Sequence, residues 1–225
     1  MNGRVYLDWN ATAPLRAEAR AAMIAAMDAV GNPSSVHGEG RAAKMIIERA
    51  REQVALAVGC NHAEVVFTSC ATEAASVLGH RASSCDVIVQ DTAHDCLWAH
   101  VDVRDAADSP NGPGHMLGIG LANGETGIVS DLPKRVDRQF DYDGRKADRL
   151  LLDIVQAVGR IPFAFSWSGA DMAIMSAHKL GGPKGAGALI IRDGVEISPV
   201  SIGGGQEMGR RSGTENIIGI AGFGA

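Results

Sequence analysis

The stretch from 172 to 192, MAIMSAHKLGGPKGAGALIIR, contains two short apolar runs separated by a polar, glycine-rich connection. Each run is nearly continuous in apolar character, which is typical of a strand buried on both faces. Similar runs occur earlier in the chain, separated by polar segments or helical patterns. The strand candidates are Glu64–Thr68, Asp86–Gln90, Met116–Leu121, Leu150–Asp153, Met172–Met175 and Ala188–Arg192.

Two helical patterns precede these strands. The alanine-rich segment 16–28 has a helical period, and 40–58 is a longer amphipathic pattern that Gly59 ends as a C-cap. The alternation of strands and helical patterns predicts an α/β fold, a three-layer sandwich with helices on both faces of a mainly parallel sheet. The polar segments 102–114 and 137–149 read as surface loops. Thirteen of the 28 glycines fall between 181 and 224, so we expect mostly loops and turns there.

The composition favours a globular protein that acts on a small molecule. The 225 residues are 46% hydrophobic and 21% charged, which suffices for one good core. A net charge of −5 without a dense Lys/Arg run argues against nucleic acid or an anionic membrane as the main partner. Without a signal core or an apolar stretch of about 18 residues, we expect a cytoplasmic location. The four cysteines form no CxxC pair, so neither a metal nor a disulfide framework is indicated.

Polar residues that follow the predicted strands are the candidates for chemistry, because open parallel sheets bind ligands beyond the carboxyl ends of their strands. The turn 69–73, SCATE, follows a strand and opens a helical stretch, so its N–H groups could bind a phosphate. An ordinary N-cap, with Ser69 or Thr72 as the capping residue, is the commoner use of such a turn. The glycine-containing loops 31–37 and 203–216 would also let backbone approach a ligand closely.

Asp153, Lys179 and His94 lie at three other predicted strand ends. A carboxylate such as Asp153 at the end of a buried strand needs a partner, either a protonated ring nitrogen of a cofactor or the N–H groups of the next segment. Lys179 is the one lysine of five that directly follows a buried strand, where desolvation would favour the nucleophilic amine. A solvated strand end is the alternative for Lys179. His94 could present its ring to a ligand or act as an acid or base, although a single loop histidine is usually structural.

A phosphate-binding turn, a carboxylate for a pyridinium nitrogen and a lysine that can bind an aldehyde together indicate pyridoxal phosphate. Beyond these residues, the chain resembles the cysteine desulfurase family, a pyridoxal-phosphate-dependent family of fold type I within the class V aminotransferase group. The matching stretches are YLDWNATAP (6–14), GNPSSVHGEGR (31–41), VVFTSCATEA (65–74), NGETG (123–127), LDIVQAVGRIP (152–162), SAHKLGGPKGAGAL (176–189) and GGGQEMGRRSGTEN (203–216). The match thins between about 75 and 120 and between 133 and 150.

The resemblance implies a role for each matched residue. Lys179 would bind the cofactor covalently and later move the Cα proton of the substrate, and His94 would stack on the cofactor ring. Asp153 would pair with the ring nitrogen, and Gln156 would hydrogen-bond the ring hydroxyl. The residues expected to contact the cofactor are Ala71, Thr72, His94, Asn123, Asp153, Gln156, Ser176, His178, Lys179 and Thr214.

Four of these residues, Ala71, Thr72, Ser176 and His178, would hold the cofactor phosphate. Thr214 lies in the RSGT segment, where the family's threonine reaches the phosphate bound by the neighbouring subunit. The resemblance therefore implies a homodimer with shared sites. In the loop 31–37, Asn32 is the candidate substrate contact.

The implied reaction removes sulfur from L-cysteine and gives L-alanine and a persulfide on an enzyme cysteine. That sulfur would then pass to an acceptor such as an iron–sulfur scaffold protein. The family's nucleophilic cysteine and its substrate-binding arginine lie in a C-terminal small domain. We therefore expect 1–225 to be the cofactor-binding large domain, with 1–40 contributing to the cleft.

Three departures from the family pattern bear on activity. None of the four cysteines matches the family's nucleophile, although Cys96, two residues after His94, is an alternative position for it. Cys70 replaces a glycine usual in the phosphate loop, and Gly124 occupies the second position of the family's asparagine pair.

Two other functions stay open. One is another class V enzyme, such as an aminotransferase or selenocysteine lyase, although SAHKLGGPKG and RSGTEN favour the desulfurase pattern. The other is a shortened, non-catalytic protein that binds the cofactor or a partner.

Overall fold

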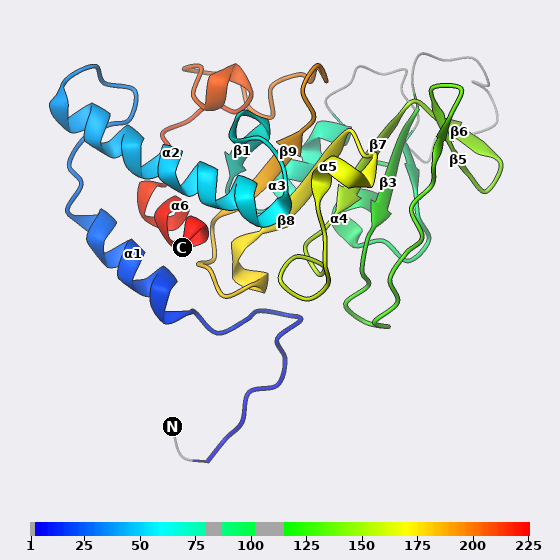
Figure 1. Ribbon diagram of the computed structural model, residues 1–225, viewed down its shortest axis with the longest axis horizontal. Helices are drawn as coiled ribbons and strands as arrows, with labels where there is room; N and C mark the ends of the chain where they lie inside the picture. The colour runs from blue at the N-terminus through cyan, green and yellow to red at the C-terminus, as the bar shows by residue number, and fades with distance from the viewer. Residues whose placement is uncertain (1–2, 80–86, 102–114) are drawn as a thin grey trace.

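The computed structural model describes residues 3–79, 87–101 and 115–225, and its centre is a six-stranded sheet (Figure 1). The strand order is β1-β9-β8-β7-β3-β2. The strands are β1 (Val65–Thr68), β2 (Val87–Val89), β3 (Met116–Gly120), β7 (Arg149–Asp153), β8 (Met172–Ser176) and β9 (Gly187–Ile191). All six coincide with predicted strands to within one or two residues at each end; Asp86, the first residue of one prediction, lies outside the described residues.

The sheet is mainly parallel. Parallel ladders join β2 to β3, β3 to β7 and β7 to β8, whereas β9 runs antiparallel to both β8 and β1. Because β9 alone is reversed, the carboxyl ends of the other five strands lie at one edge of the sheet. The register pairs Gly120 with Asp153 and Asp153 with Ile174, so the last residue of β7 lies in the middle of that edge.

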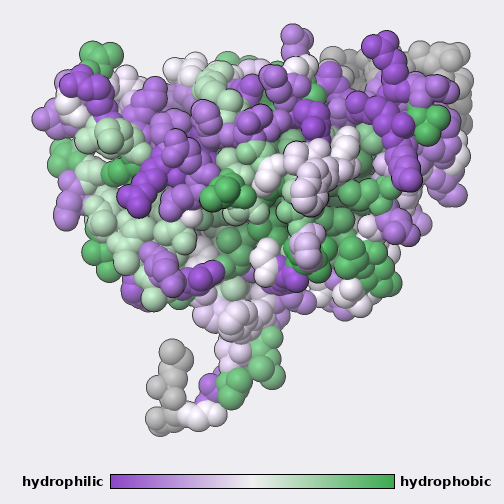
Figure 2. All heavy atoms as spheres, viewed as in Figure 1, coloured by the Kyte–Doolittle hydropathy of each residue, from purple (hydrophilic) through white to green (hydrophobic). Residues whose placement is uncertain are grey.

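Helices cover both faces of this sheet, which confirms the predicted three-layer α/β fold. On one face, α2 (Gly38–Val58) and α6 (Ile217–Gly224) pack over a core that includes Phe67, Leu150 and Leu152. On the other face, α3 (Ala71–Ala75) and α4 (Asp95–Trp98) pack over Leu151 and Ile174. Figure 2 shows a polar outer surface over α2, as its amphipathic pattern predicts.

Helix α6 lies in the glycine-rich region for which the sequence predicted mostly loops and turns. Asn216 begins it by accepting a hydrogen bond from the Gly219 N–H at 3.0 Å. A Cβ atom at Gly222 would lie 2.5 Å from Met23 Cγ, and one at Gly224 would lie 2.6 Å from the Ala50 Cα. These two glycines therefore let α6 pack closely against α1 (Ala17–Met27) and α2. They serve helix packing and do not form turns.

The prediction of a surface loop over 137–149 is wrong. This segment forms most of a second, three-stranded antiparallel sheet and the first residue of β7. The small sheet consists of β4 (Arg135–Val136), β5 (Gln139–Tyr142) and β6 (Arg145–Ala147). Asp143 and Gly144 adopt φ values of 51° and 76°, which close the β5–β6 hairpin tightly, and Phe140 is 1% exposed against the main core. The other predicted loop, 102–114, lies outside the described residues.

The N-terminal segment begins outside the body of the molecule and runs back to it beneath the sheet edge (Figure 1). Figure 2 shows apolar side chains along it, and Val5 and Leu7 are 74% and 82% exposed. Its return is attached where the Ala13 N–H donates to the His178 carbonyl at 2.8 Å and the Arg16 N–H donates to Gly181. These contacts place residues 8–12 against the carboxyl ends of the strands. In the described part of the chain, no helix is long and apolar enough to cross a membrane.

Candidate active site

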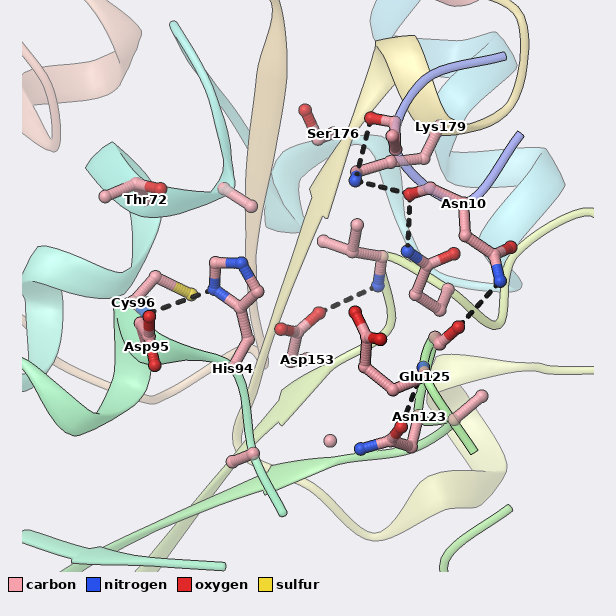
Figure 3. A pocket seen from close by; sticks show the side chains of 18 of the residues that line it. Asn10, Thr72, His94, Asp95, Cys96, Asn123, Glu125, Asp153, Ser176 and Lys179 are labelled. Atoms are coloured by element: carbon pink, nitrogen blue, oxygen red, sulfur yellow. Dashed lines mark hydrogen bonds between the residues drawn. The ribbon is translucent and has the colours of Figure 1, made fainter. Parts of the chain in front are cut away.

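A cavity of about 850 Å³ lies at the edge where the five strand carboxyl ends meet (Figure 3). The segments that follow β1, β2, β3, β7 and β8 all contribute to its wall, and the N-terminal segment contributes Asp8, Asn10 and Ala11. This is the position at which open parallel sheets bind ligands.

The cavity brings together nine of the ten residues expected to contact a cofactor. They are Ala71, Thr72, His94, Asn123, Asp153, Gln156, Ser176, His178 and Lys179. Thr214, the tenth, is exposed and does not line the cavity. Asn32 is also exposed and away from it, and its Oδ1 accepts a hydrogen bond from the Ser34 N–H at 2.9 Å.

Lys179 ends the short 3-10 turn η3 (Ala177–Lys179), which follows β8 directly. Its Nζ donates to the carbonyl oxygens of Asn10 at 2.6 Å and Ala11 at 3.0 Å (Figure 3). Burial lowers the pKa of the Lys179 amine and the nearby Arg160 guanidinium lowers it further, while Asp153 and Asp8 oppose the shift. The structure therefore holds a partly desolvated lysine in the cavity wall.

Asp153 ends β7 and is 8% exposed. Its Oδ1 accepts a hydrogen bond from the Val155 N–H at 2.9 Å. Burial raises the pKa of the Asp153 carboxyl, although that hydrogen bond and the electrostatic effects of His94 and Lys179 partly offset it. A buried carboxylate of this kind would gain from a cationic hydrogen-bond donor placed in the cavity.

His94 is the N-cap of α4. Its Nδ1 accepts a hydrogen bond from the Cys96 N–H at 3.1 Å, so the neutral ring carries its proton on Nε2. In Figure 3 the imidazole projects into the cavity beside Asp153. The ring is thus held at one nitrogen and presents the rest of its surface to a ligand.

Cys70 is the N-cap of α3, the helix that follows β1. The sequence had suggested Ser69 or Thr72 as the capping residue. The Cys70 Sγ accepts from the Glu73 N–H at 3.4 Å. Cys70 has a φ of −170°, extended backbone that any residue adopts, so a side chain is accommodated where the family usually has glycine. Ala71 and Thr72 begin α3, and the first N–H groups of a helix have no intrahelical acceptor.

Ser176 and His178 approach the cavity from β8 and η3. Ser176 is 2% exposed, and its Oγ has no hydrogen-bond partner among the described residues. A buried hydroxyl without a partner is costly and indicates a missing polar ligand. The His178 Nδ1 lies 3.1 Å from the Thr12 Oγ1, and burial together with Lys179 and Lys184 lowers the pKa of His178.

Gln156 and Asn123 also line the cavity, and both side chains already have hydrogen-bond partners within the chain. The Gln156 Nε2 donates to the Asn10 carbonyl at 2.9 Å, and its Oε1 accepts from Arg160. A Cβ at Gly124 would lie 2.9 Å from the Gln156 Nε2, so the glycine makes room for this arrangement. The Asn123 Oδ1 accepts from the backbone of Glu125 and Thr126, both at 2.8 Å, which shapes the cavity rim.

Sequence reasoning overlooked Asn10 and Arg160 as parts of this site. Both lie in quoted blocks, YLDWNATAP and LDIVQAVGRIP, but no local pattern connects them with Lys179. The Asn10 carbonyl accepts from both Lys179 and Gln156, and its Nδ2 donates to the Gly124 carbonyl at 2.7 Å. The tertiary fold alone brings these segments into contact.

The structure disfavours Cys96 as a nucleophile. Cys96 is 5% exposed, and burial together with the charge of Asp153 raises the pKa of its thiol to about 12. Because the thiolate is the reactive form, the Cys96 thiol stays protonated and unreactive near neutral pH. Burial also raises the pKa of Cys60 to about 12, and Cys85 lies outside the described residues.

Residues 5–97 and 115–225 match the model of the aminotransferase class-V family. The chain therefore belongs to the class-V aminotransferase family.

The relatives it resembles carry more specific names. The chain is 33% identical to "Cysteine desulfurase 2" of Trichormus variabilis and 36% identical to "Cysteine desulfurase" of Frankia sp.. Each alignment covers 98% of this chain and 61% of the relative, so the chain spans about three fifths of the length of these proteins.

Solved structures give the same picture. A "NIFS-LIKE PROTEIN" matches with a TM-score of 0.84 and 32% identity, over 98% of this chain and 68% of that one. "SspA in complex with cysteine" matches with a TM-score of 0.82 and 26% identity, over 98% of this chain and 71% of that one.

Proposed function

We propose that residues 1–225 are the cofactor-binding large domain of a pyridoxal-phosphate-dependent cysteine desulfurase. The observation that carries the proposal is the cavity itself, in which the partly desolvated Lys179 amine and the buried Asp153 carboxylate meet at adjacent strand ends. These are the groups that a cofactor with an aldehyde and a protonated ring nitrogen requires. The names of the relatives support the same reaction class.

The residues present fit this cofactor. The unpartnered Ser176 Oγ and the first N–H groups of α3 offer hydrogen-bond donors for a phosphate group. Together with Thr72 and His178 they would form its binding cradle, and the exposed Thr214 would reach the phosphate bound by the partner subunit. The one poor fit is Gln156, whose amide already has two protein partners and must rotate to contact the ring hydroxyl.

When bound here, pyridoxal phosphate supplies an electron-accepting ring that stabilises negative charge at the Cα of an amino acid. Asp153 would hold the ring nitrogen protonated, because a buried carboxylate is stabilised by a cationic hydrogen-bond donor. His94 would pack against the ring, and Asn123 would contribute to the cavity rim beside it. Lys179 is the residue that would hold the cofactor aldehyde, and its amine would be the base that takes the Cα proton of the substrate.

The proposed substrate is L-cysteine and the proposed products are L-alanine and a persulfide on an enzyme cysteine. An enzyme thiolate would attack the substrate sulfur. As the S–S bond forms, the C–S bond breaks, and its electron pair stays with the substrate carbon, which takes up a proton to give alanine. The sulfur then passes to an acceptor such as an iron–sulfur scaffold protein. The proposed enzyme is a cytoplasmic homodimer, and Asn32, which does not line this subunit's cavity, is the proposed substrate contact.

Covalent loading of Lys179 is the decisive test. The protein is incubated with pyridoxal phosphate, reduced with borohydride, digested and mapped by mass spectrometry. We expect the mass increase on Lys179, its loss in Lys179→Ala, and no change in Lys44→Ala, which alters an exposed lysine on α2. A wild-type protein that acquires neither colour nor mass contradicts the proposal.

Turnover separates a desulfurase from a non-catalytic binding protein. Burial raises the pKa of the Cys60 and Cys96 thiols to about 12, so the thiolate needed for turnover has to come from another cysteine. We expect alanine release from L-cysteine in the presence of a thiol reductant. Covalent loading without alanine would favour the non-catalytic function, and amino transfer to a keto acid would favour an aminotransferase.

A further inference from the structure

Glu73, in the first turn of α3, joins the first residue of the candidate phosphate-binding turn to Arg211 of a distant loop. Its Oε2 accepts from the Ser69 N–H at 2.5 Å, and its Oε1 accepts from the Arg211 Nε at 2.8 Å. The two side chains are only 21% and 20% exposed. Burial opposes ionisation, but the hydrogen bonds from Arg211 and Ser69 outweigh it and lower the pKa of Glu73, so the carboxylate is charged.

Arg211 is presented by a loop whose two ends are hydrogen-bonded together. The Val200 N–H donates to the Arg210 carbonyl at 2.7 Å, and the Ser212 N–H donates to the Ser201 carbonyl at 3.1 Å. The Ser201 hydroxyl also donates to the Ser212 carbonyl at 2.8 Å. The guanidinium of Arg211 therefore extends from a closed backbone loop and not from a free segment.

The same loop is attached to β1 through Glu207. The Arg51 guanidinium binds both carboxylate oxygens of Glu207, at 2.7 and 2.8 Å, and the Phe67 N–H donates to Glu207 at 2.8 Å. Because Phe67 lies in β1 and Glu73 lies in α3, the loop contacts the chain on both sides of the turn 69–72. The turn is therefore fixed from outside the cavity.

We propose that Glu73 and Arg211 are positioning residues that hold the turn 69–72 in the shape that accepts the cofactor phosphate. This inference rests on the proposed function. Neither residue lines the described wall of the cavity, so both act through the Ser69 N–H that the Glu73 carboxylate binds. Arg211 has a second effect, because it neutralises a carboxylate that would otherwise repel an anion bound at the same turn.

Comparing pyridoxal phosphate with pyridoxal, which lacks the phosphate, tests this role. In Arg211→Met we expect the apparent affinity for pyridoxal phosphate to fall about tenfold, since a partly buried charge pair is broken and Glu73 is left unpaired. The affinity for pyridoxal should change by less than about twofold, because it presents no phosphate to the turn. The matched control is Arg210→Met, which alters a neighbouring guanidinium that donates to the Ala63 carbonyl at 2.9 Å.

A double variant separates charge from geometry. Glu73→Gln keeps an amide oxygen that can accept from Ser69 but removes the negative charge. We therefore expect the double variant Glu73→Gln with Arg211→Met to bind pyridoxal phosphate more tightly than Arg211→Met alone. Equal losses for pyridoxal and pyridoxal phosphate, or no loss for either, would overturn the inference.

Hydrogen exchange of the cofactor-free protein gives a readout that does not depend on binding. We expect the amides of residues 69–75 to exchange faster in Arg211→Met and to be unchanged in Arg210→Met. Unchanged exchange in Arg211→Met would show that the pair does not order the turn. If the wild-type protein fails to bind pyridoxal phosphate, the proposed function fails, while this exchange result still decides the positioning role.

Discussion

At the residue scale, the protonation of Lys179 depends on contacts from two distant segments. The carbonyls of Asn10 and Ala11 accept from its Nζ and favour the charged ammonium. Burial and the positive charge of Arg160 favour the neutral amine and prevail, so the pKa of Lys179 is lowered. This balance matters because the neutral amine is the form that attacks an aldehyde.

Arg160→Met tests that balance. Removing the positive charge should raise the pKa of Lys179, so covalent loading by pyridoxal phosphate should require a higher pH than in the wild type. The measurement is the rate of loading against pH, followed by visible absorbance. Lys134→Met removes a positive charge from an exposed residue outside the cavity and should leave the profile in place. A profile that does not move in Arg160→Met would contradict the assignment.

Asp153→Asn should separate stability from function. Burial raises the pKa of Asp153 in the folded protein, so between its ordinary value near 4 and the raised value the folded state binds more protons than the unfolded chain. The wild-type, cofactor-free protein therefore loses stability as pH rises through that window. In urea titrations at several pH values, the variant should lack this loss and be more stable at neutral pH, yet bind pyridoxal phosphate more weakly. A less stable variant at neutral pH would contradict the effect of burial.

At the scale of elements, the strands of the central sheet are predictable because their side chains are buried on both faces and read as continuous apolar runs. The small sheet β4–β5–β6 gives no such signal. Only Phe140 and Ala147 of its strands are buried, and its turns use Asp137, Arg138 and Asp143 at positive φ in addition to Gly144. The sequence of a segment with polar turn residues and short strands therefore resembles that of a loop.

Phe140→Ala tests whether the small sheet contributes to the main core. Phe140 is 1% exposed, and the Arg135 guanidinium lies 4.5 Å from its ring centroid. We expect the free energy of unfolding to fall by about 3–5 kcal/mol, as for other buried phenylalanines. Val136→Ala, at a position 65% exposed on β4, should change it by less than about 0.5 kcal/mol. Urea denaturation measures the free energy of unfolding of both variants. If Phe140→Ala lost as little stability as Val136→Ala, the hairpin would not contribute to the main core.

At the scale of the whole molecule, the ion pair of Arg51 and Glu207 joins α2 and β1 to the loop that carries Arg211. Both residues are 4% exposed, and the Arg51 guanidinium also lies 4.9 Å from the Phe67 ring centroid. Glu207 and Met208 adopt φ values of 49° and 59°, which are unfavourable for residues other than glycine. The buried contacts of Glu207 offset that local strain.

Removing one charge of this pair should destabilise the folded protein more than removing both charges. Arg51→Met leaves a buried, unpaired carboxylate and should reduce the free energy of unfolding by about 3–5 kcal/mol. The double variant with Glu207→Gln should lose less than the sum of the two single variants, because residues in contact are coupled. Thermal and urea unfolding of all four proteins measures the coupling. Strictly additive losses would show that the pair does not act as a unit.

The sequence by itself determined the layers of the fold and most of the candidate site. Buried strands have a local signature, and residues such as Asp153 and Lys179 that end parallel strands must meet at one edge of the sheet. The tertiary structure alone decided how that site is held. The contacts of Lys179 with Asn10, of Arg51 with Glu207 and of Arg211 with Glu73 join residues 169, 156 and 138 positions apart. No local pattern encodes such pairs, because they form only when packing brings the segments together.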